Sequence, residues 1–120
     1  MGCLAVEVQD GRSRQFIKWV PQGVNLDLIG VARRMRWARP YFPVPQVVDA
    51  GRGDTGSWLV TEALPGEMAV MPRWKADPST AVRAIGEGLR AFHEALAVEK
   101  CPFSLSAEDR VADAQRRAAE

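Results

Sequence analysis

One lysine inside an apolar strand and one strand that ends in a proline-glycine break are the parts of this sequence best suited to chemistry. Lys18 stands among Phe16, Ile17 and Trp19. A buried ammonium group is costly unless an anion pairs with it, so Lys18 either reaches solvent or binds an anion such as a phosphate. Further along, residues 58–66 read Trp-Leu-Val-Thr-Glu-Ala-Leu-Pro-Gly, a buried strand that runs into a break. Together these stretches indicate half of a nucleotide site.

The end of the second stretch has the shape of a hinge that holds a flat ring. Residues 61–63 leave a strand just before a proline. A carbonyl and an amide two residues apart can meet the two hydrogen-bonding positions on the edge of an adenine. An ordinary strand end and an edge-strand lysine that reaches solvent remain the simpler alternatives for these residues.

Other chemistry has little support in the composition. The single histidine, His93, follows Phe92 on an apolar-faced helix, and no nucleophile or metal-ligand spacing accompanies it. Cys3 and Cys101 stand far apart, and without a secretion signal we expect reduced thiols and a cytoplasmic location. No apolar run of about 20 residues is present, so we expect no membrane span.

The charge balance also limits the classes of partner. The net charge is +1, which gives no general attraction to nucleic acid or to membranes. Residues 33–39 form a basic helix end that contains a tryptophan, and a nucleic-acid-binding module is the least favoured of our alternatives. With 120 residues, 47% of them hydrophobic, the chain is globular and forms one domain at most.

The elements that must position Lys18 and the hinge follow from turn and capping signals. Asp10-Gly11 predicts a hairpin, and Asp27 predicts the cap of a helix that Pro40 ends by pushing Arg39 to extended angles. The expected strands and first helix occupy residues 4–8, 15–20, 28–38, 46–49 and 57–62, with a glycine-rich turn at 51–56.

The second half of the chain is expected to be helical. Residues 68–77 read as irregular, and Asp77-Pro78 begins a helix. Its apolar positions recur every three or four residues, which predicts one buried face. These positions are Val82, Ile85, Leu89, Phe92 and Leu96. Ser106 and Asp109 then predict the capping box of a last helix.

The order of these pieces resembles the aminoglycoside 3'-phosphotransferase family, which has the protein-kinase-like fold. Six islands carry the resemblance, in the right order and near the right spacing. They are residues 16–18, 34–37, 43–45, 58–66, 89–93 and 101–103. The resemblance implies an α+β fold. Residues 1–66 are expected to form the amino-terminal nucleotide-binding lobe and hinge, and residues 67–120 the incomplete start of a helical carboxy-terminal lobe.

The resemblance also implies roles for individual residues. Lys18 matches the lysine that binds the phosphates of ATP, and Val60 matches the residue behind the adenine. The carbonyl of Thr61 and the amide of Ala63 match the hinge groups that bond the adenine edge. The family further implies ATP, Mg²⁺ and a small acceptor such as an aminoglycoside.

Three departures from the family pattern limit what this chain is expected to do. The catalytic His-Gly-Asp segment and the later metal-binding aspartate have no counterpart, so we assign no catalytic or metal residue. The position of the helix glutamate that pairs with the lysine holds Val31. We therefore expect a truncated phosphotransferase fragment, connected with antibiotic resistance only through its family, that is inactive alone. The alternatives are a non-catalytic nucleotide- or protein-binding lobe and a gene remnant without function.

Overall fold

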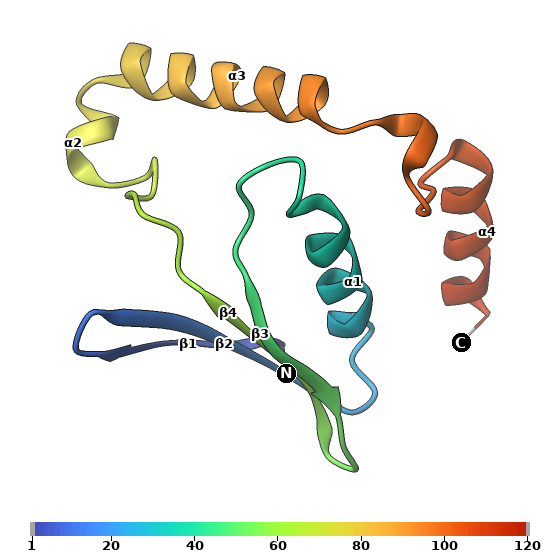
Figure 1. Cartoon of the computed structure of the whole chain (residues 1–120). Helices are drawn as coiled ribbons and strands as arrows, with labels where there is room; N and C mark the ends of the chain where they lie inside the picture. Colours follow the sequence, from blue (N-terminus) through green and yellow to red (C-terminus); the bar gives the residue numbers. More distant parts are fainter. Residues whose placement is uncertain (1, 120) are drawn as a thin grey trace.

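A four-stranded antiparallel sheet forms the first half of the molecule in the computed structural model, which describes residues 2–119. The strand order is β1-β2-β4-β3, so the two hairpins lie side by side and the chain crosses over through a helix (Figure 1). The strands are β1 (Leu4–Asp10), β2 (Ser13–Pro21), β3 (Val47–Arg52) and β4 (Gly56–Glu62). Helices complete the second half, which confirms the α+β class.

The first hairpin forms where the sequence predicts it. Asp10 pairs with Ser13, which leaves Gly11 and Arg12 as a two-residue loop. Gly11 has a φ of 58°, in the left-handed region that hairpin loops of this length require at their first position. The pairing fixes the register of β2 and therefore the position of Lys18 in the sheet.

Helix α1 (Leu28–Ala38) has the predicted bounds and the predicted cap. The amide of Gly30 donates to Asp27 Oδ1 at 2.9 Å, which satisfies one free donor of the first turn. The expectation of extended angles before Pro40 was wrong, because Arg39 keeps helical angles of −55° and −40°. The helix ends there because proline has no amide hydrogen to donate.

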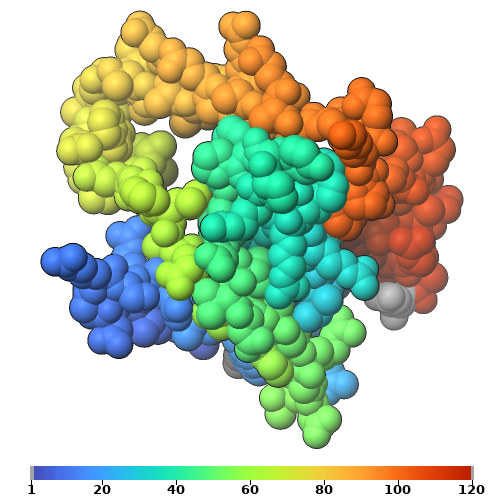
Figure 2. Space-filling view, in the orientation of Figure 1, coloured from blue at the N-terminus to red at the C-terminus, as the bar shows by residue number. Residues whose placement is uncertain are grey.

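The hydrophobic core lies between α1 and one face of the sheet. Val20, Leu28, Ala32 and Leu59 are at most 2% exposed and form its centre. Around them pack the half-buried side chains Val31, Met35, Val47 and Ala50. Helix α1 packs against β3 and β4, and Figure 2 shows its teal atoms beside the green atoms of these strands. This packing fixes the face of the sheet on which Lys18 lies.

The second hairpin differs from the sequence prediction in its turn. Strand β3 continues to Arg52, so the loop is residues 53–55 instead of the whole stretch 51–56. The ring of Trp58 occupies the place where a Cβ on Gly51 would stand. Gly51 therefore allows close packing within a strand. A glycine-rich sequence does not show whether a glycine has this role or belongs to a turn.

Four helical segments form the second half. They are α2 (Pro72–Lys75), α3 (Pro78–Ala95), the 3₁₀ turn η1 (Val98–Lys100) and α4 (Ala107–Ala118). The sequence did not predict α2. The capping box of α4 is present, because Ser106 and Asp109 bond each other's backbone amides. Among the described residues, no helix is both long and apolar enough to cross a membrane.

Helix α3 lies away from the sheet, and its predicted apolar face is mostly uncovered (Figure 1). Val82, Ile85 and Leu89 are 67%, 51% and 55% exposed. Only the end of the stripe is covered, where the ring of Phe92 meets that of Phe42 edge-on at 5.3 Å. The prediction of an amphipathic helix is confirmed, whereas burial of its face is not observed within residues 2–119.

Candidate nucleotide site

Lys18 lies on the face of the sheet that α1 covers. It stands directly opposite Leu59 of β4, and directly opposed residues of antiparallel strands point to the same face. The Lys18 side chain is nevertheless exposed, and it forms no ion pair with a carboxylate of residues 2–119. The ammonium group is therefore available to an anion at this edge of the core.

The end of β4 places Thr61 and Val60 on opposite faces. Thr61 stands opposite Phe16, on the face of Lys18, and is 9% exposed. Val60 stands opposite Ile17, on the outer face. The structure thus brings Thr61 and Lys18 to one face, and it directs Val60 away from both.

The backbone at the hinge is partly engaged in the sheet. The amide of Ala63 donates to the carbonyl of Arg14 at 2.9 Å, and the amide of Glu62 donates to that of Gln46 at 2.9 Å. Thr61 is paired with residues of both neighbouring strands. Leu64 is the first residue after β4 whose amide donates to no backbone carbonyl of residues 2–119.

Val31 lies on α1, the helix that packs against the face of the sheet that carries Lys18. Its half-buried side chain packs against the cluster that contains Leu59, the cross-strand neighbour of Lys18. Residues 28–38 include no aspartate or glutamate. Helix α1 therefore offers no carboxylate to Lys18.

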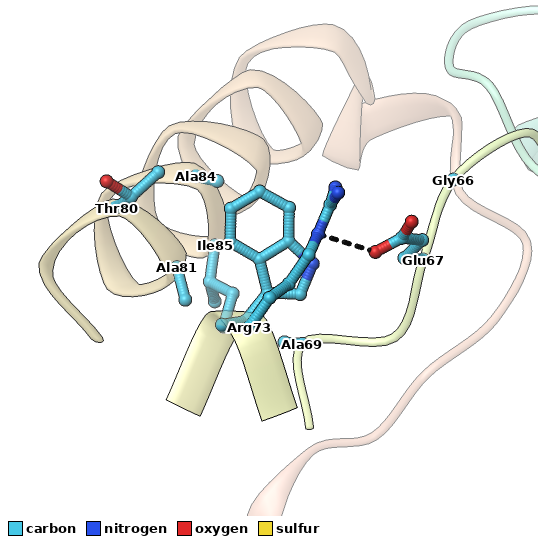
Figure 3. Close-up of a pocket in the computed structure, with 9 residues that line it drawn as sticks. Gly66, Glu67, Ala69, Arg73, Thr80, Ala81, Ala84 and Ile85 are labelled. Atoms are coloured by element: carbon cyan, nitrogen blue, oxygen red, sulfur yellow. Dashed lines mark ion pairs between the residues drawn. The ribbon is translucent and has the colours of Figure 1, made fainter. Parts of the chain in front are cut away.

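An apolar cavity of about 520 Å³ follows the hinge but contains none of the four residues expected at the site. It lies between the loop after Gly66, α2 and the first turns of α3 (Figure 3). Arg73 Nε forms an ion pair with Glu67 Oε2 at 2.8 Å, and Arg73 Cζ lies 4.3 Å from the centre of the Trp74 ring. Sequence reasoning missed this cavity, because one of its walls, formed by Arg73 and Trp74, belongs to α2, which no sequence signal indicated.

The other sequence candidates stay apart from Lys18. His93 contacts the ring of Phe92 on α3, at a distance of 6.0 Å between ring centres. Arg34 lies over the ring of Phe103, and Arg39 donates to the carbonyl of Val44 at 3.2 Å, so part of the basic stretch makes local contacts. Within residues 2–119, no three His, Cys, Asp or Glu side chains converge as a metal site.

Comparison with known proteins gives a consistent result. The model of the phosphotransferase enzyme family matches residues 4–120. An aminoglycoside 3'-phosphotransferase of Streptomyces fradiae is 43% identical over 102 residues, which is 83% of this chain and 37% of the relative. One from Streptomyces ribosidificus is 46% identical over 69% of this chain and 32% of its own length.

A relative whose name gives a different acceptor position also matches. The streptomycin 3''-kinase of Streptomyces griseus is 36% identical over 85% of this chain and 37% of the relative. This chain thus spans about a third of the length of the curated relatives. Because the family model covers nearly all of its residues, the chain belongs to the phosphotransferase enzyme family.

Proposed function

We propose that this chain is the nucleotide-binding part of an ATP-dependent phosphotransferase that acts on a small molecule. The observation that carries the proposal is the shared face of Lys18 and Thr61 at the end of β4, beside α1. A point charge in the middle of a strand pair and free backbone groups just beyond the end of β4 suit the phosphates and the base of one nucleotide. Lys18 would contact the phosphates of ATP.

The adenine edge is expected to lie at residues 60–64. The resemblance assigns Val60 to the back of the ring and assigns Thr61 and Ala63 to its edge. The hydrogen bond from Ala63 to Arg14 and the outward direction of Val60 favour a shift of one residue. Thr61 would then stand behind the ring, and the carbonyl of Glu62 and the amide of Leu64 would bond its edge.

The acceptor class is proposed from the relatives alone. Two of them are aminoglycoside 3'-phosphotransferases, and another is a streptomycin 3''-kinase. We propose an aminoglycoside-like hydroxyl compound as the acceptor of the complete fold. No residue of this chain is assigned to its recognition.

We further propose that these 120 residues alone transfer no phosphate. Phosphoryl transfer needs a base or positioning group for the attacking hydroxyl and a metal that neutralises charge on the phosphates. The single histidine is followed by Glu94-Ala95, and no His-Gly-Asp segment is present. Within residues 2–119, no three His, Cys, Asp or Glu side chains converge to hold Mg²⁺. Turnover of radiolabelled ATP by the purified chain with kanamycin or streptomycin would contradict this proposal.

A binding titration with ATP and three matched variants tests the nucleotide site. Lys18→Ala removes the phosphate contact, and we expect roughly tenfold weaker binding in isothermal titration. Thr61→Met fills the space behind the ring and should abolish binding. Val60→Met adds a side chain of the same size on the outer face and should leave binding unchanged.

The three variants also separate the alternatives. If Val60→Met abolishes binding and Thr61→Met does not, the hinge assignment implied by the resemblance is correct and the one-residue shift is wrong. If the wild-type chain binds no ATP although its melting is cooperative, the nucleotide site itself is wrong. Circular dichroism of each variant verifies that the sheet and α1 remain folded.

A further inference from the structure

Phe103, a residue outside the nucleotide site, lies against helix α1. Its ring meets that of Trp37 edge-on, with 6.2 Å between the ring centres, and Arg34 Cζ lies 4.9 Å from its centre. The chain between α3 and α4 therefore passes beside α1 (Figure 1). Phe103 is half-buried, whereas Leu105, two residues later, is 81% exposed. Phe103 thus joins the second half of the chain to the first.

The contact uses a face of α1 that does not pack against the sheet. Side chains three or four residues apart share one face of a helix. Val31 and Met35 belong to the face that packs against the core, whereas Arg34 and Trp37 form a second face. Helix α1 is therefore held from two sides, by the sheet and by Phe103.

Local bonds restrain the segment that carries Phe103. The amide of Cys101 donates to the carbonyl of Val98 at 3.1 Å, and Cys101 Sγ donates to the carbonyl of Phe103 at 3.5 Å. Pro102 fixes one backbone angle between them. The capping box at Ser106 then begins α4. Because the segment is already ordered, little conformational entropy is lost when the ring of Phe103 docks on α1.

A glycine on α1 makes room for the arginine that Phe103 contacts. A Cβ on Gly30 would meet both the carboxylate of Asp27 and the guanidinium of Arg34. Without that Cβ, the Arg34 side chain can lie close to the helix, with the ring of Phe103 against its guanidinium. A guanidinium over an aromatic ring is an attractive arrangement, and the attraction grows where water is excluded.

We propose that Phe103 is a positioning residue for the nucleotide site, because it holds α1 against the sheet. Helix α1 has no carboxylate, so no ion pair ties the helix to Lys18. Val31 and Met35 border the core on the face of the sheet that carries Lys18, and a shift of α1 would move them relative to it. The inference rests on the proposed function, which places the nucleotide beside α1. By linkage, a nucleotide that orders α1 must also strengthen the contact at Phe103.

Hydrogen exchange of the α1 amides tests the contact without any nucleotide. In Phe103→Ala we expect these amides to exchange about fivefold faster, because the helix loses its support on one face. Leu105→Ala removes a large apolar side chain from the same segment and should leave the exchange unchanged. Phe103→Tyr keeps the ring and should retain the wild-type rate. Unchanged exchange in Phe103→Ala would overturn the proposal.

Titration with ATP tests the link to the nucleotide site. We expect about fivefold weaker binding to Phe103→Ala, and wild-type affinity in Leu105→Ala and Phe103→Tyr. The reciprocal effect is measured on the intact contact. With Cys3 replaced by serine, the half-buried Cys101 is the remaining thiol, and saturating ATP should slow its modification by a thiol reagent.

The outcomes distinguish this inference from the function on which it rests. If ATP binds wild type and Phe103→Ala equally and leaves the modification of Cys101 unchanged, the inference is wrong and the nucleotide site stands. If wild type binds no ATP, the proposed function is wrong, and the role of Phe103 at that site falls with it even where the α1 amides respond to Phe103→Ala. Circular dichroism verifies that Phe103→Ala keeps its helices and sheet.

Discussion

At the scale of single residues, Lys18 has no acidic partner on α1, because position 31 of that helix holds a valine. Lys18 stands opposite Leu59, and Val31 packs against the core cluster that contains Leu59. A carboxylate at position 31 would therefore stand at the border of that cluster. The valine contributes to the core instead, and it leaves the orientation of Lys18 to be set by solvent and ligand.

We predict that Val31→Glu increases the affinity of this chain for ATP. The new carboxylate should hold Lys18 toward the phosphates, and a partly exposed pair is worth up to about 1 kcal/mol, or roughly fivefold in the dissociation constant. Titration of Val31→Glu, Lys18→Ala and the double variant measures the coupling. Val31→Gln is the uncharged control, and an equal gain with glutamine would show that charge is not the cause.

At the scale of elements, helix α4 depends on its first turn. Hydrogen bonds from Ser104 and Ser106 to the carboxylate of Asp109 lower the pKa of Asp109 below its ordinary value of 3.8. An aspartate with a lowered pKa stabilises the folded helix above its unfolded pKa, and that contribution disappears as pH falls through the folded value. The charged capping box therefore stabilises α4 at neutral pH, and this contribution is lost in acid.

We predict that Ser106→Ala costs α4 about 1 kcal/mol and that Asp109→Asn loosens it at pH 7 only. The helical signal in circular dichroism should fall in both variants at neutral pH. Below the folded pKa of Asp109, wild type and Asp109→Asn should give the same signal. A difference between those two proteins that persists in acid would show that the carboxylate charge is not what stabilises the turn.

Local signals in the sequence predicted the elements that local bonds determine. Asp27 and Ser106 accept from backbone amides within three residues, and Gly11 adopts the φ that the turn requires, so the bounds of α1, the turn of the first hairpin and the start of α4 could be predicted directly, whereas the two strands of that hairpin are longer than the expected 4–8 and 15–20. The faces of the sheet on which Thr61 and Val60 lie could not be predicted from the sequence, because they depend on the register between β2 and β4. Helix α2 has only four residues, too few for a periodic pattern.

The whole molecule consists of one small packed unit and a helical extension with little packing of its own. The centre of the core has four side chains, all between α1 and the sheet. No residue of α2, α3 or α4 is fully buried. Stability is therefore concentrated in the first half of the chain, and the helices of the second half should open independently.

We predict that leucine-to-alanine substitutions in the two halves have very unequal effects on stability. Leu28→Ala empties a site that is 1% exposed and should cost about 2–5 kcal/mol in urea unfolding, which approaches the whole stability of a small domain. Leu89→Ala, at a site 55% exposed, should change the unfolding free energy by less than about 0.5 kcal/mol. A large loss from Leu89→Ala would show that the face of α3 is covered in solution.

The uncovered face of α3 also determines how long the chain would persist in a cell. Val82, Ile85 and Leu89 present the kind of apolar segment that chaperones and proteases recognise in unfolded proteins, yet here they belong to the native state. Degradation could then begin at the loops around α3 without global unfolding, and the half-life would follow local opening instead of overall stability. Any partner that covers this face would lengthen the lifetime of the chain before it changed any reaction.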